Sequence, residues 1–254
     1  MHIDVKGLTF GYDKKRQILH EISFAVPKAD FLGILGPNGT GKTTLTKCIA
    51  GILKPHAGNI FLDGRNIREF SIKDVAKRIA YVPQSSRDEF SLTVMDTVIM
   101  GRLPYVQFSY SKEDRELASM ALEELNLKDM AHRPLHAMSG GEKQRVFIAR
   151  ALVQQPEIII LDEPTSSLDP HNQLLILKLI EKIAVEKKVT ILMTIHDLNL
   201  ASLFCKQLLI LKDAGIFAYG KTNDVLTEAN VRSVYHVNTR SSFIEGYKYM
   251  NLLR

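Results

Sequence analysis

The amino-acid composition describes a globular chain with a mildly basic surface. Its 254 residues include 45% hydrophobic side chains, enough for one large domain with a sizeable core. No apolar run approaches the roughly 20 residues that span a bilayer, and the first residues lack the apolar stretch of a signal peptide, so we expect neither feature. The net charge of +5 is scattered and forms no long Lys/Arg block, so we expect no binding to nucleic acid.

The cysteines and histidines do not indicate a metal centre. Cys48 and Cys205 belong to no metal-binding or redox motif, and we expect both to be reduced and buried in a cytosolic protein. His132 and His136 have the spacing of two ligands on one helical face. Pro134 lies between them and breaks the helix that this arrangement requires, so we predict no metal site there.

The chain begins with segments typical of antiparallel strands. Short, alternating apolar runs occupy residues 1–30. Tyr12 comes just before a loop in this segment, where its ring either stacks on a nucleotide base or packs at the edge of the sheet. A further strand pair surrounds the Asp63-Gly64 turn. The apolar run Ile79–Pro83 predicts another strand.

A glycine-rich loop between a predicted strand and a predicted helix carries the strongest functional signal. Residues 31–35 form a short apolar run of strand length, and we expect a helix after the loop. The apolar face of that helix is predicted to hold Leu45, Ile49, Ile52 and Leu53. The loop itself consists of Gly36, Pro37, Asn38, Gly39, Thr40, Gly41, Lys42, Thr43 and Thr44. Strand, loop and helix together are the context that the pattern G-x-x-x-x-G-K-[ST] requires.

The loop has the chemistry of a nucleotide site. Its glycines can adopt backbone conformations that a Cβ penalises, so their N–H groups can turn inward and face an anion. The N-terminus of the following helix adds unpaired N–H groups and the positive end of its dipole. In this motif the lysine, here Lys42, reaches the β- and γ-phosphates, and the hydroxyl, here Thr43, ligates Mg²⁺.

A second match to the same pattern, Gly215–Thr222, is not expected to bind phosphate. Asp213-Ala214-Gly215 is typical of a hairpin turn after an apolar run. Residues 216–219 then have the pattern of a returning strand, with bulky side chains where a phosphate nest needs bare backbone.

Residues 91–153 are predicted to be mostly helical, because apolar side chains recur there at helical spacing in two stretches. The first stretch contains Leu117, Met120, Ala121 and Leu125, and the second contains Val146, Ala149, Leu152 and Val153. We interpret the segment as a helical subdomain inserted into an α/β core.

Ser139, Gly140, Gly141 and Glu142 open the second of these helices. Glycines and a serine at a helix N-terminus form a second anion site, although the same residues also form an ordinary helix start. Two phosphate-binding elements far apart in one chain pose a geometric problem. Two copies packed head-to-tail solve it, with each nucleotide between the loop of one copy and the serine-glycine helix of the other.

The α/β pattern resumes after the helical segment. Glu157–Leu161 is a continuous apolar run, as expected for a strand buried on both faces of a parallel sheet. A helix and then a strand at Val189–Thr194 follow. Residues 222–254 are less patterned, and we expect a short helix there that is capped by Thr222 or Asn223.

Several predicted strands end at residues suited to phosphate chemistry, and ligands of parallel α/β sheets bind outside the carboxyl ends of the strands. Asp162 suits a carboxylate that holds Mg²⁺ through water. Glu163 can polarise a water for attack on the γ-phosphate if the strand has already ended there. For His196 we favour contact with the γ-phosphate or the attacking water over a core or capping role. Gln84 either contacts Mg²⁺ or the water, or merely caps the next turn.

Together these features resemble the ATP-binding cassette (ABC) ATPases over nearly the whole chain. The matching residues are Gly36–Thr44 (Walker A), Ile158–Asp162 with Glu163 (Walker B), Met138–Glu142 (signature), Gln84 (Q-loop), His196 (switch histidine), Ser166–Asp169 (D-loop) and Tyr12 (adenine-stacking aromatic). Met138 stands where leucine is usual, and Ser167 where alanine is common. Both departures are mild.

The resemblance implies a P-loop NTPase (RecA-like) α/β core with an N-terminal antiparallel β subdomain and an inserted helical subdomain. We expect one domain over residues 1–254, with the core at about 1–87 and 154–220, helices at about 88–153 and a tail at 221–254. The implied cofactors are ATP and Mg²⁺. Implied nucleotide contacts are the loop residues with Tyr12, Ser139, Gly140, Gly141 and Asp169. Implied metal ligands are Thr43, Gln84 and Asp162, and implied catalytic residues are Lys42, Gln84, Glu163 and His196.

The resemblance also implies partners: a second copy, transmembrane permease subunits and a periplasmic or extracellular substrate-binding protein, at the cytoplasmic face of the inner membrane. Met100–Tyr105 and Thr194–Asn199 are similar to the ATPases of importers for iron-siderophore, haem and cobalamin chelates. Arg102 is a candidate contact with the membrane subunit. The segment Gln84–Phe90 bridges the core and the helices, and we predict that it relays the state of ATP to the permease.

Two alternative functions remain open from the sequence. One is an ATPase of another transporter, for metal ions or of the exporter type. The other is a non-transport cassette protein that acts on ribosomes or nucleic acid, although this chain has neither a second cassette nor a long coiled-coil insertion.

Overall fold

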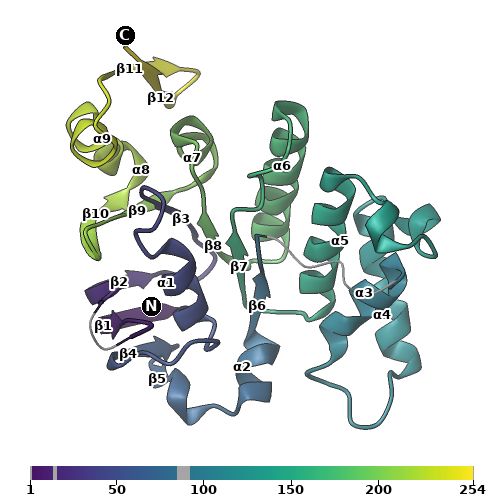
Figure 1. Ribbon diagram of the computed structural model, residues 1–254. Coiled ribbons are helices and arrows are strands. Elements are labelled where there is room, and N and C mark those ends of the chain that lie inside the picture. Colours follow the sequence, from purple (N-terminus) through teal and green to yellow (C-terminus); the bar gives the residue numbers. More distant parts are fainter. Residues whose placement is uncertain (1, 14–15, 85–91, 254) are drawn as a thin grey trace.

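A mixed, mostly parallel sheet forms the centre of the molecule in the computed structural model, which describes residues 2–13, 16–84 and 92–253 (Figure 1). Among these residues its strand order is β10-β9-β3-β8-β7-β6, and only the β9–β10 pair is antiparallel. The strands are β3 (Phe31–Leu35), β6 (Ile79–Val82), β7 (Ile158–Asp162), β8 (Thr190–Thr194), β9 (Gln207–Lys212) and β10 (Gly215–Lys221). The hairpin of β9 and β10 confirms that Gly215–Thr222 is not a second phosphate loop.

Both faces of this sheet are buried, which explains its continuous apolar runs. In β7, Ile158 and Ile160 belong to the core under the N-terminal strands, whereas Ile159 and Leu161 belong to the core under the helices. All four side chains are at most 2% exposed. Successive side chains of a strand point to opposite faces, so a strand covered on both sides must be apolar at every position.

A second, antiparallel sheet packs over one face of the central sheet and confirms the predicted N-terminal β layer. Its strand order is β2-β1-β4-β5. The strands are β1 (Ile3–Phe10), β2 (Leu19–Val26), β4 (Ala57–Leu62) and β5 (Arg65–Asn66). The predicted Asp63-Gly64 turn joins β4 to β5, where Leu62 pairs with Arg65. Ile3 lies opposite both Val26 and Leu62, so β1 is an interior strand of this layer.

Helices cover the remaining surfaces, and α3 to α5 lie together on one side of the molecule (Figure 1). The helices are α1 (Lys42–Ile49), α2 (Ile72–Arg78), α3 (Val94–Ile99), α4 (Lys112–Glu124), α5 (Gly140–Val153), α6 (Pro170–Glu186), α7 (Leu198–Phe204), α8 (Thr222–Val225) and α9 (Glu228–Tyr235). Short 3₁₀ turns follow β5 (Ile67–Glu69) and α3 (Met100–Arg102), and two more precede α5 (Lys128–Met130 and Leu135–Ala137). The predicted fold class is therefore confirmed.

One helix is shorter than the sequence pattern predicts. Helix α1 ends at Ile49, so Ile52 and Leu53 do not continue its apolar face. The chain turns at Gly51, which has a φ of 71°, a value that favours glycine. Ile52 is consequently 55% exposed. Periodicity alone extended the helix across this turn, and the prediction for Ile52 and Leu53 was wrong.

The C-terminal segment has more structure than its sequence pattern suggests. After α9 it forms a hairpin of β11 (Thr239–Ile244) and β12 (Tyr247–Leu252). Buried Met250 of β12 attaches the hairpin to α7, and its backbone N–H donates to Asn199 Oδ1 at 2.8 Å. The expected cap is wrong: α8 begins at Thr222, and the hydroxyl of Thr222 donates to the Cys205 carbonyl instead.

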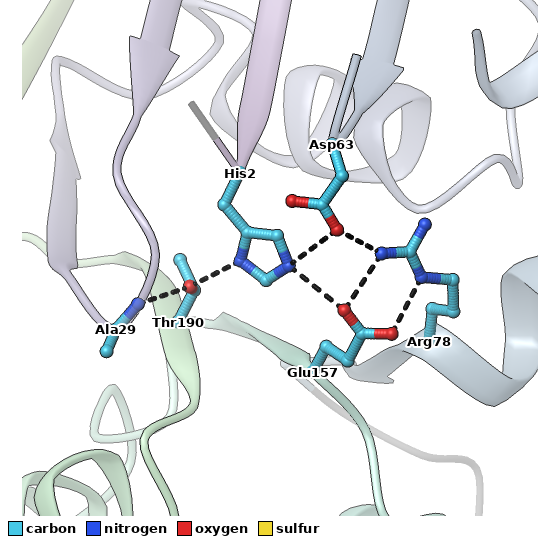
Figure 2. Close-up of polar contacts among 6 residues, drawn as sticks. All are labelled: His2, Ala29, Asp63, Arg78, Glu157 and Thr190. Atoms are coloured by element: carbon cyan, nitrogen blue, oxygen red, sulfur yellow. Dashed lines mark hydrogen bonds and ion pairs between the residues drawn. The ribbon is translucent and has the colours of Figure 1, made fainter. Parts of the chain in front are cut away.

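A polar network joins the two sheets near the N-terminus (Figure 2). The Arg78 guanidinium donates to both oxygens of Glu157 at 2.8 Å and to Asp63 at 2.5 Å. The buried His2 ring lies 3.3 Å from Glu157 and 2.7 Å from the Thr190 hydroxyl. His2, Asp63 and Glu157 come close enough to share a metal ion. Arg78 already neutralises both carboxylates, so we interpret the cluster as a structural ion-pair network.

Within residues 2–13, 16–84 and 92–253, every helix is too short or too polar to cross a bilayer.

Candidate functional site

A pocket of about 590 Å³ opens at the carboxyl ends of the central strands, where the sequence placed the site. We call it the nucleotide pocket. Its lining contains ten of the predicted site residues: Tyr12, Asn38, Gly39, Gly41, Lys42, Thr43, Thr44, Gln84, Glu163 and His196. Arg16 and Ile18 also line it, although neither is a predicted site residue. Segments far apart in the chain therefore converge on one cavity.

The glycine-rich loop needs glycine for steric as well as conformational reasons. Gly36 has a φ of 146°, and a Cβ there would lie 2.5 Å from the Leu211 carbonyl oxygen. Gly41 has a φ of 97° and caps α1, and a Cβ would lie 2.9 Å from Leu19. The Thr40 hydroxyl donates to the Pro37 carbonyl at 2.9 Å and closes the loop. The predicted phosphate loop is thus formed as the pattern requires.

Lys42 is a buried cation at the floor of the pocket. Its ammonium group donates to the carbonyls of Gly36 (2.8 Å) and Pro37 (3.1 Å). Burial lowers the pKa of Lys42 below its ordinary value, and the charges of Glu163 and Asp162 oppose that effect. An anion in the pocket would favour the charged form further, so Lys42 is suited to bind phosphate.

Asp162 ends β7 and lies 3% exposed behind the pocket, held by three hydroxyl groups. Its Oδ1 accepts from Thr43 at 3.1 Å and from Thr194 at 2.8 Å. Its Oδ2 accepts from the Tyr81 phenol at 3.1 Å. Thr43 and Asp162, both predicted as metal ligands, are therefore in contact. Tyr81 and Thr194 were missed, because a tyrosine and a threonine inside apolar strands resemble ordinary core residues.

Glu163 turns into the same pocket because the strand ends one residue earlier. Its φ is 49°, a left-handed conformation that is uncommon for residues other than glycine. The Thr194 hydroxyl accepts from the Glu163 N–H at 2.8 Å and stabilises this turn. A strand conformation would have pointed adjacent carboxylates to opposite faces. The strand has thus ended before Glu163, as the role expected for this residue requires.

The carboxylate of Glu163 joins Gln84 and His196 at the pocket wall. The Gln84 amide donates to Oε2 at 2.5 Å. His196 donates through Nε2 to Oε1 at 2.5 Å. The Glu163 side chain is 12% exposed, and that of His196 is 40% exposed. Gln84 thus faces the site, and residues 85–90 of the predicted relay segment lie outside the described residues.

Tyr12 stands at the mouth of the pocket with its ring 66% exposed. The ring packs at right angles to that of Phe10, at 5.1 Å between ring centroids. Its hydroxyl lies 3.4 Å from the Thr44 hydroxyl. Tyr12 therefore lines the pocket and is still largely exposed. The position of Tyr12 is therefore compatible with stacking on a nucleotide base and with packing at the edge of the sheet.

The serine-glycine helix does not reach the nucleotide pocket within this chain. Ser139 caps α5 in a capping box with Glu142, and its hydroxyl donates to Glu142 at 2.8 Å. A Cβ on Gly141 would lie 3.0 Å from Asn172, whose amide donates to Asp169 at 2.6 Å. Gly140, Gly141 and Asp169 thus gather with Ser139 at a second edge, apart from the residues that line the pocket.

Arg102 does not have the exposure that a contact with a membrane subunit requires. It is 6% exposed, and its Nε donates to buried Asp114 at 2.7 Å. Its Nη1 donates to the Val153 carbonyl at 2.8 Å. The side chain connects α4 to α5, and the suggestion that Arg102 contacts a membrane subunit is wrong. Both cysteines, as predicted, are free and buried.

The fold and the site define an ATP-binding protein, and comparison with known proteins identifies the family. The family model for ABC transporters matches residues 19–166. The chain belongs to the ABC transporter family, as an ATP-binding subunit with ATPase activity. Subunits of this kind work with transmembrane permease components and dimerise.

Individual relatives support the assignment along the whole chain. The chain is 42% identical to an ABC transporter ATP-binding protein of Methanocaldococcus jannaschii, over 97% of this chain and 96% of the relative. It is 38% identical to the iron(3+)-hydroxamate import ATP-binding protein FhuC of Bacillus subtilis, over 93% and 88%. A solved structure described as a metal-chelate type ABC transporter, inward-facing, superposes with a TM-score of 0.86 at 29% identity, over 99% and 96%.

Proposed function

We propose that the chain is the ATP-hydrolysing subunit of an importer for a metal chelate such as an iron-siderophore. Relatives named for import of iron(3+)-hydroxamate and petrobactin, and for transport of achromobactin, are 35–38% identical to it over more than nine-tenths of its length. The observation that carries the hydrolytic part is the convergence of Lys42, Glu163 and His196 on one pocket. The names of these relatives support a metal chelate as the imported substrate.

ATP would enter with its base at Tyr12 and its phosphates over the loop. The open ring surface of Tyr12 suits stacking on adenine. Lys42 would exchange the carbonyls of its own loop for the β- and γ-phosphates, a stronger, charge-assisted interaction. The backbone N–H groups at the start of α1 add to the same positive field.

The residues beside Asp162 fit Mg²⁺. Thr43 and Asp162 offer oxygen atoms 3.1 Å apart, and the Gln84 carboxamide supplies another oxygen at the pocket wall. Oxygen ligands are those that Mg²⁺ prefers. We propose that Thr43, Gln84 and Asp162 hold the ion, directly or through water. When bound, Mg²⁺ would supply positive charge that neutralises the phosphates.

Glu163 would position and deprotonate the attacking water. The carboxylate is fixed from both sides by Gln84 and His196, so its oxygens are already oriented before ATP arrives. The His196 ring is partly exposed and can shift its Nε2–H toward the γ-phosphate. In-line attack then depends on placement and charge neutralisation supplied by these residues.

A second copy would complete the site. Ser139, Gly140, Gly141 and Asp169 form their own cluster away from the pocket, which a head-to-tail dimer would bring onto the γ-phosphate of the partner's ATP. A solved dimer of an ATP-binding cassette with ADP and phosphate is 27% identical, with a TM-score of 0.75 over 87% of this chain and 98% of that one. It supports the dimeric state.

We propose that a permease helix packs in an apolar groove of about 420 Å³ beside α2, which we call the α2 groove. It is lined by residues that include Ile52, Phe70, Ile72, Val75 and Tyr81. Ile72 is 90% exposed, and exposed apolar side chains beside a hollow favour a protein partner. We further propose that the chain works at the cytoplasmic face of the membrane, in a complex that includes a substrate-binding protein.

The test is ATPase activity of the purified chain with and without membranes that contain candidate permeases. Wild-type turnover should rise with a chelate permease, and Ile72→Glu should lose most of that rise while its basal turnover stays unchanged. A glutamate suits the first turn of α2, so the fold should persist. Val185→Glu, at an exposed position on α6, is the control. The proposal would be contradicted if ATPase turnover were unchanged by every permease but rose with ribosomes or DNA.

A further inference from the structure

Tyr81 belongs to two sites at once. Its phenol donates to Asp162 Oδ2 at 3.1 Å, on the side of the nucleotide pocket. Its ring lines the α2 groove and packs against the core between the two sheets. Packing therefore holds the ring in place, and the hydroxyl has a fixed direction toward the carboxylate.

The Tyr81 phenol supplies the hydrogen bond to the second carboxylate oxygen of Asp162. Thr43 and Thr194 both donate to Oδ1, whereas Tyr81 donates to Oδ2. Burial raises the pKa of Tyr81 above its ordinary range, and the nearby Asp162 charge adds to the effect. Both carboxylate oxygens are thereby oriented.

We propose that Tyr81 is a positioning residue that holds the Asp162 carboxylate in the orientation needed for Mg²⁺ beside bound nucleotide. This inference rests on the proposed role of Asp162 in metal binding. Partners that hydrogen-bond a ligating carboxylate orient it, and their removal typically weakens metal binding by about 10–100-fold. Asp162 is expected to act through water, so the lower end of that range applies.

Tyr105 offers a matched control, because its phenol also makes one hydrogen bond. Its phenol donates to the Gln154 carbonyl at 3.0 Å, and Gln154 also lines the groove. Tyr105→Phe removes one partly buried phenol hydrogen bond, as Tyr81→Phe does, but leaves Asp162 untouched. Thr194→Val is a second test variant, because it removes a different donor to the same carboxylate.

The experiment measures Mn²⁺ binding to the complete chain with ADP present, by electron paramagnetic resonance, for wild type and the three variants. Tyr81→Phe should weaken Mn²⁺ binding by about tenfold, and Thr194→Val should weaken it in the same direction. Tyr105→Phe should match wild type. Binding of ADP in EDTA should be equal in all four proteins, and the Mg²⁺ concentration for half-maximal ATPase should rise for Tyr81→Phe more than its maximal rate falls.

Two results would overturn the inference alone: wild-type Mn²⁺ affinity in a folded Tyr81→Phe protein, or an equal loss in Tyr105→Phe. A different result would overturn the proposed function and the inference with it. In that case wild type itself would bind ADP with no dependence on Mn²⁺ or Mg²⁺. The wild-type titration therefore distinguishes failure of the inference about Tyr81 from failure of the proposed function.

Discussion

Two adjacent carboxylates face one site because a single residue leaves the strand conformation. Glu163 has a φ of 49°, directly after β7 ends at Asp162. Left-handed backbone at a residue with a Cβ costs of order 1 kcal/mol and persists only where surrounding contacts hold it. Here Thr194 holds it, as acceptor from the Glu163 N–H and donor to Asp162. Thr194 is fully buried, so water does not compete for these bonds.

Replacing Glu163 by glutamine should separate binding from hydrolysis. Glu163→Gln keeps the size of the side chain but removes the base, so the hydrolysis rate should fall by about 100-fold or more. Binding of ATP should change little, because Lys42 and the loop are untouched, and ATP-bound dimers should accumulate in size-exclusion chromatography. Glu186→Gln, at an exposed position at the end of α6, is the control. A variant with near-normal turnover would remove Glu163 from the mechanism.

Among the elements, the junction between the two sheets depends on charge. The network of Figure 2 connects β1, the β4–β5 turn, α2 and the entry to β7 through His2, Asp63, Arg78 and Glu157. The hydrogen bonds from Arg78 are the main reason that the pKa of Glu157 falls from 4.5 to about 2, against the opposing effect of burial. Because Arg78 bonds both carboxylates, its loss should affect the whole junction.

The pH dependence of stability should reveal this junction. A folded-state pKa below the unfolded value stabilises the protein above pH 4.5, and that stability is lost as the pH falls toward 2. Arg78→Met should lower the free energy of unfolding at pH 7 by about 1–2 kcal/mol, reduced by solvent screening because Glu157 is 39% exposed. The difference from wild type should shrink between pH 4.5 and 2 in urea denaturation. A difference independent of pH would contradict this.

The helical elements show how a conspicuous surface motif can be structural. Arg102 and Asp114 are each 6% exposed and form a buried pair between the turn after α3 and the start of α4. Asp114 also completes the capping box of α4 with Ser111. A buried guanidinium needs such a partner, because an unpaired charge in the interior is costly. The motif around Arg102 therefore stabilises the helical segment and does not offer a free cation.

For the whole molecule, the separation of Ser139 from Lys42 predicts that two defective chains can complement each other. Lys42→Ala and Ser139→Arg should each be inactive as pure proteins. In a head-to-tail dimer of one of each, one site carries both defects and the other is intact. A 1:1 mixture should therefore recover about a quarter of the wild-type number of sites, measured as ATPase activity with permease present. A mixture as inactive as its components would argue against head-to-tail assembly.

The sequence by itself determined the architecture and most of the candidate site. Parallel strands buried on both faces are continuous apolar runs, so their ends could be located, and the residues after those ends had to lie at one edge of the sheet. The phosphate loop is a local structure, in which glycine positions and Lys42 are only a few residues apart. Such features depend on residues that are close together in the chain, so they can be predicted from the sequence.

The tertiary structure alone decided which ordinary-looking residues serve that site. Tyr81 meets Asp162 across 81 positions of sequence, and Thr194 meets it across 32. Arg102 became a buried partner of Asp114 instead of a surface contact, and α1 ended early enough to expose Ile52 in a groove. These outcomes depend on how elements distant in sequence pack against one another. The local sequence pattern does not predict that packing, because the same tyrosine, threonine or arginine is equally compatible with other neighbours.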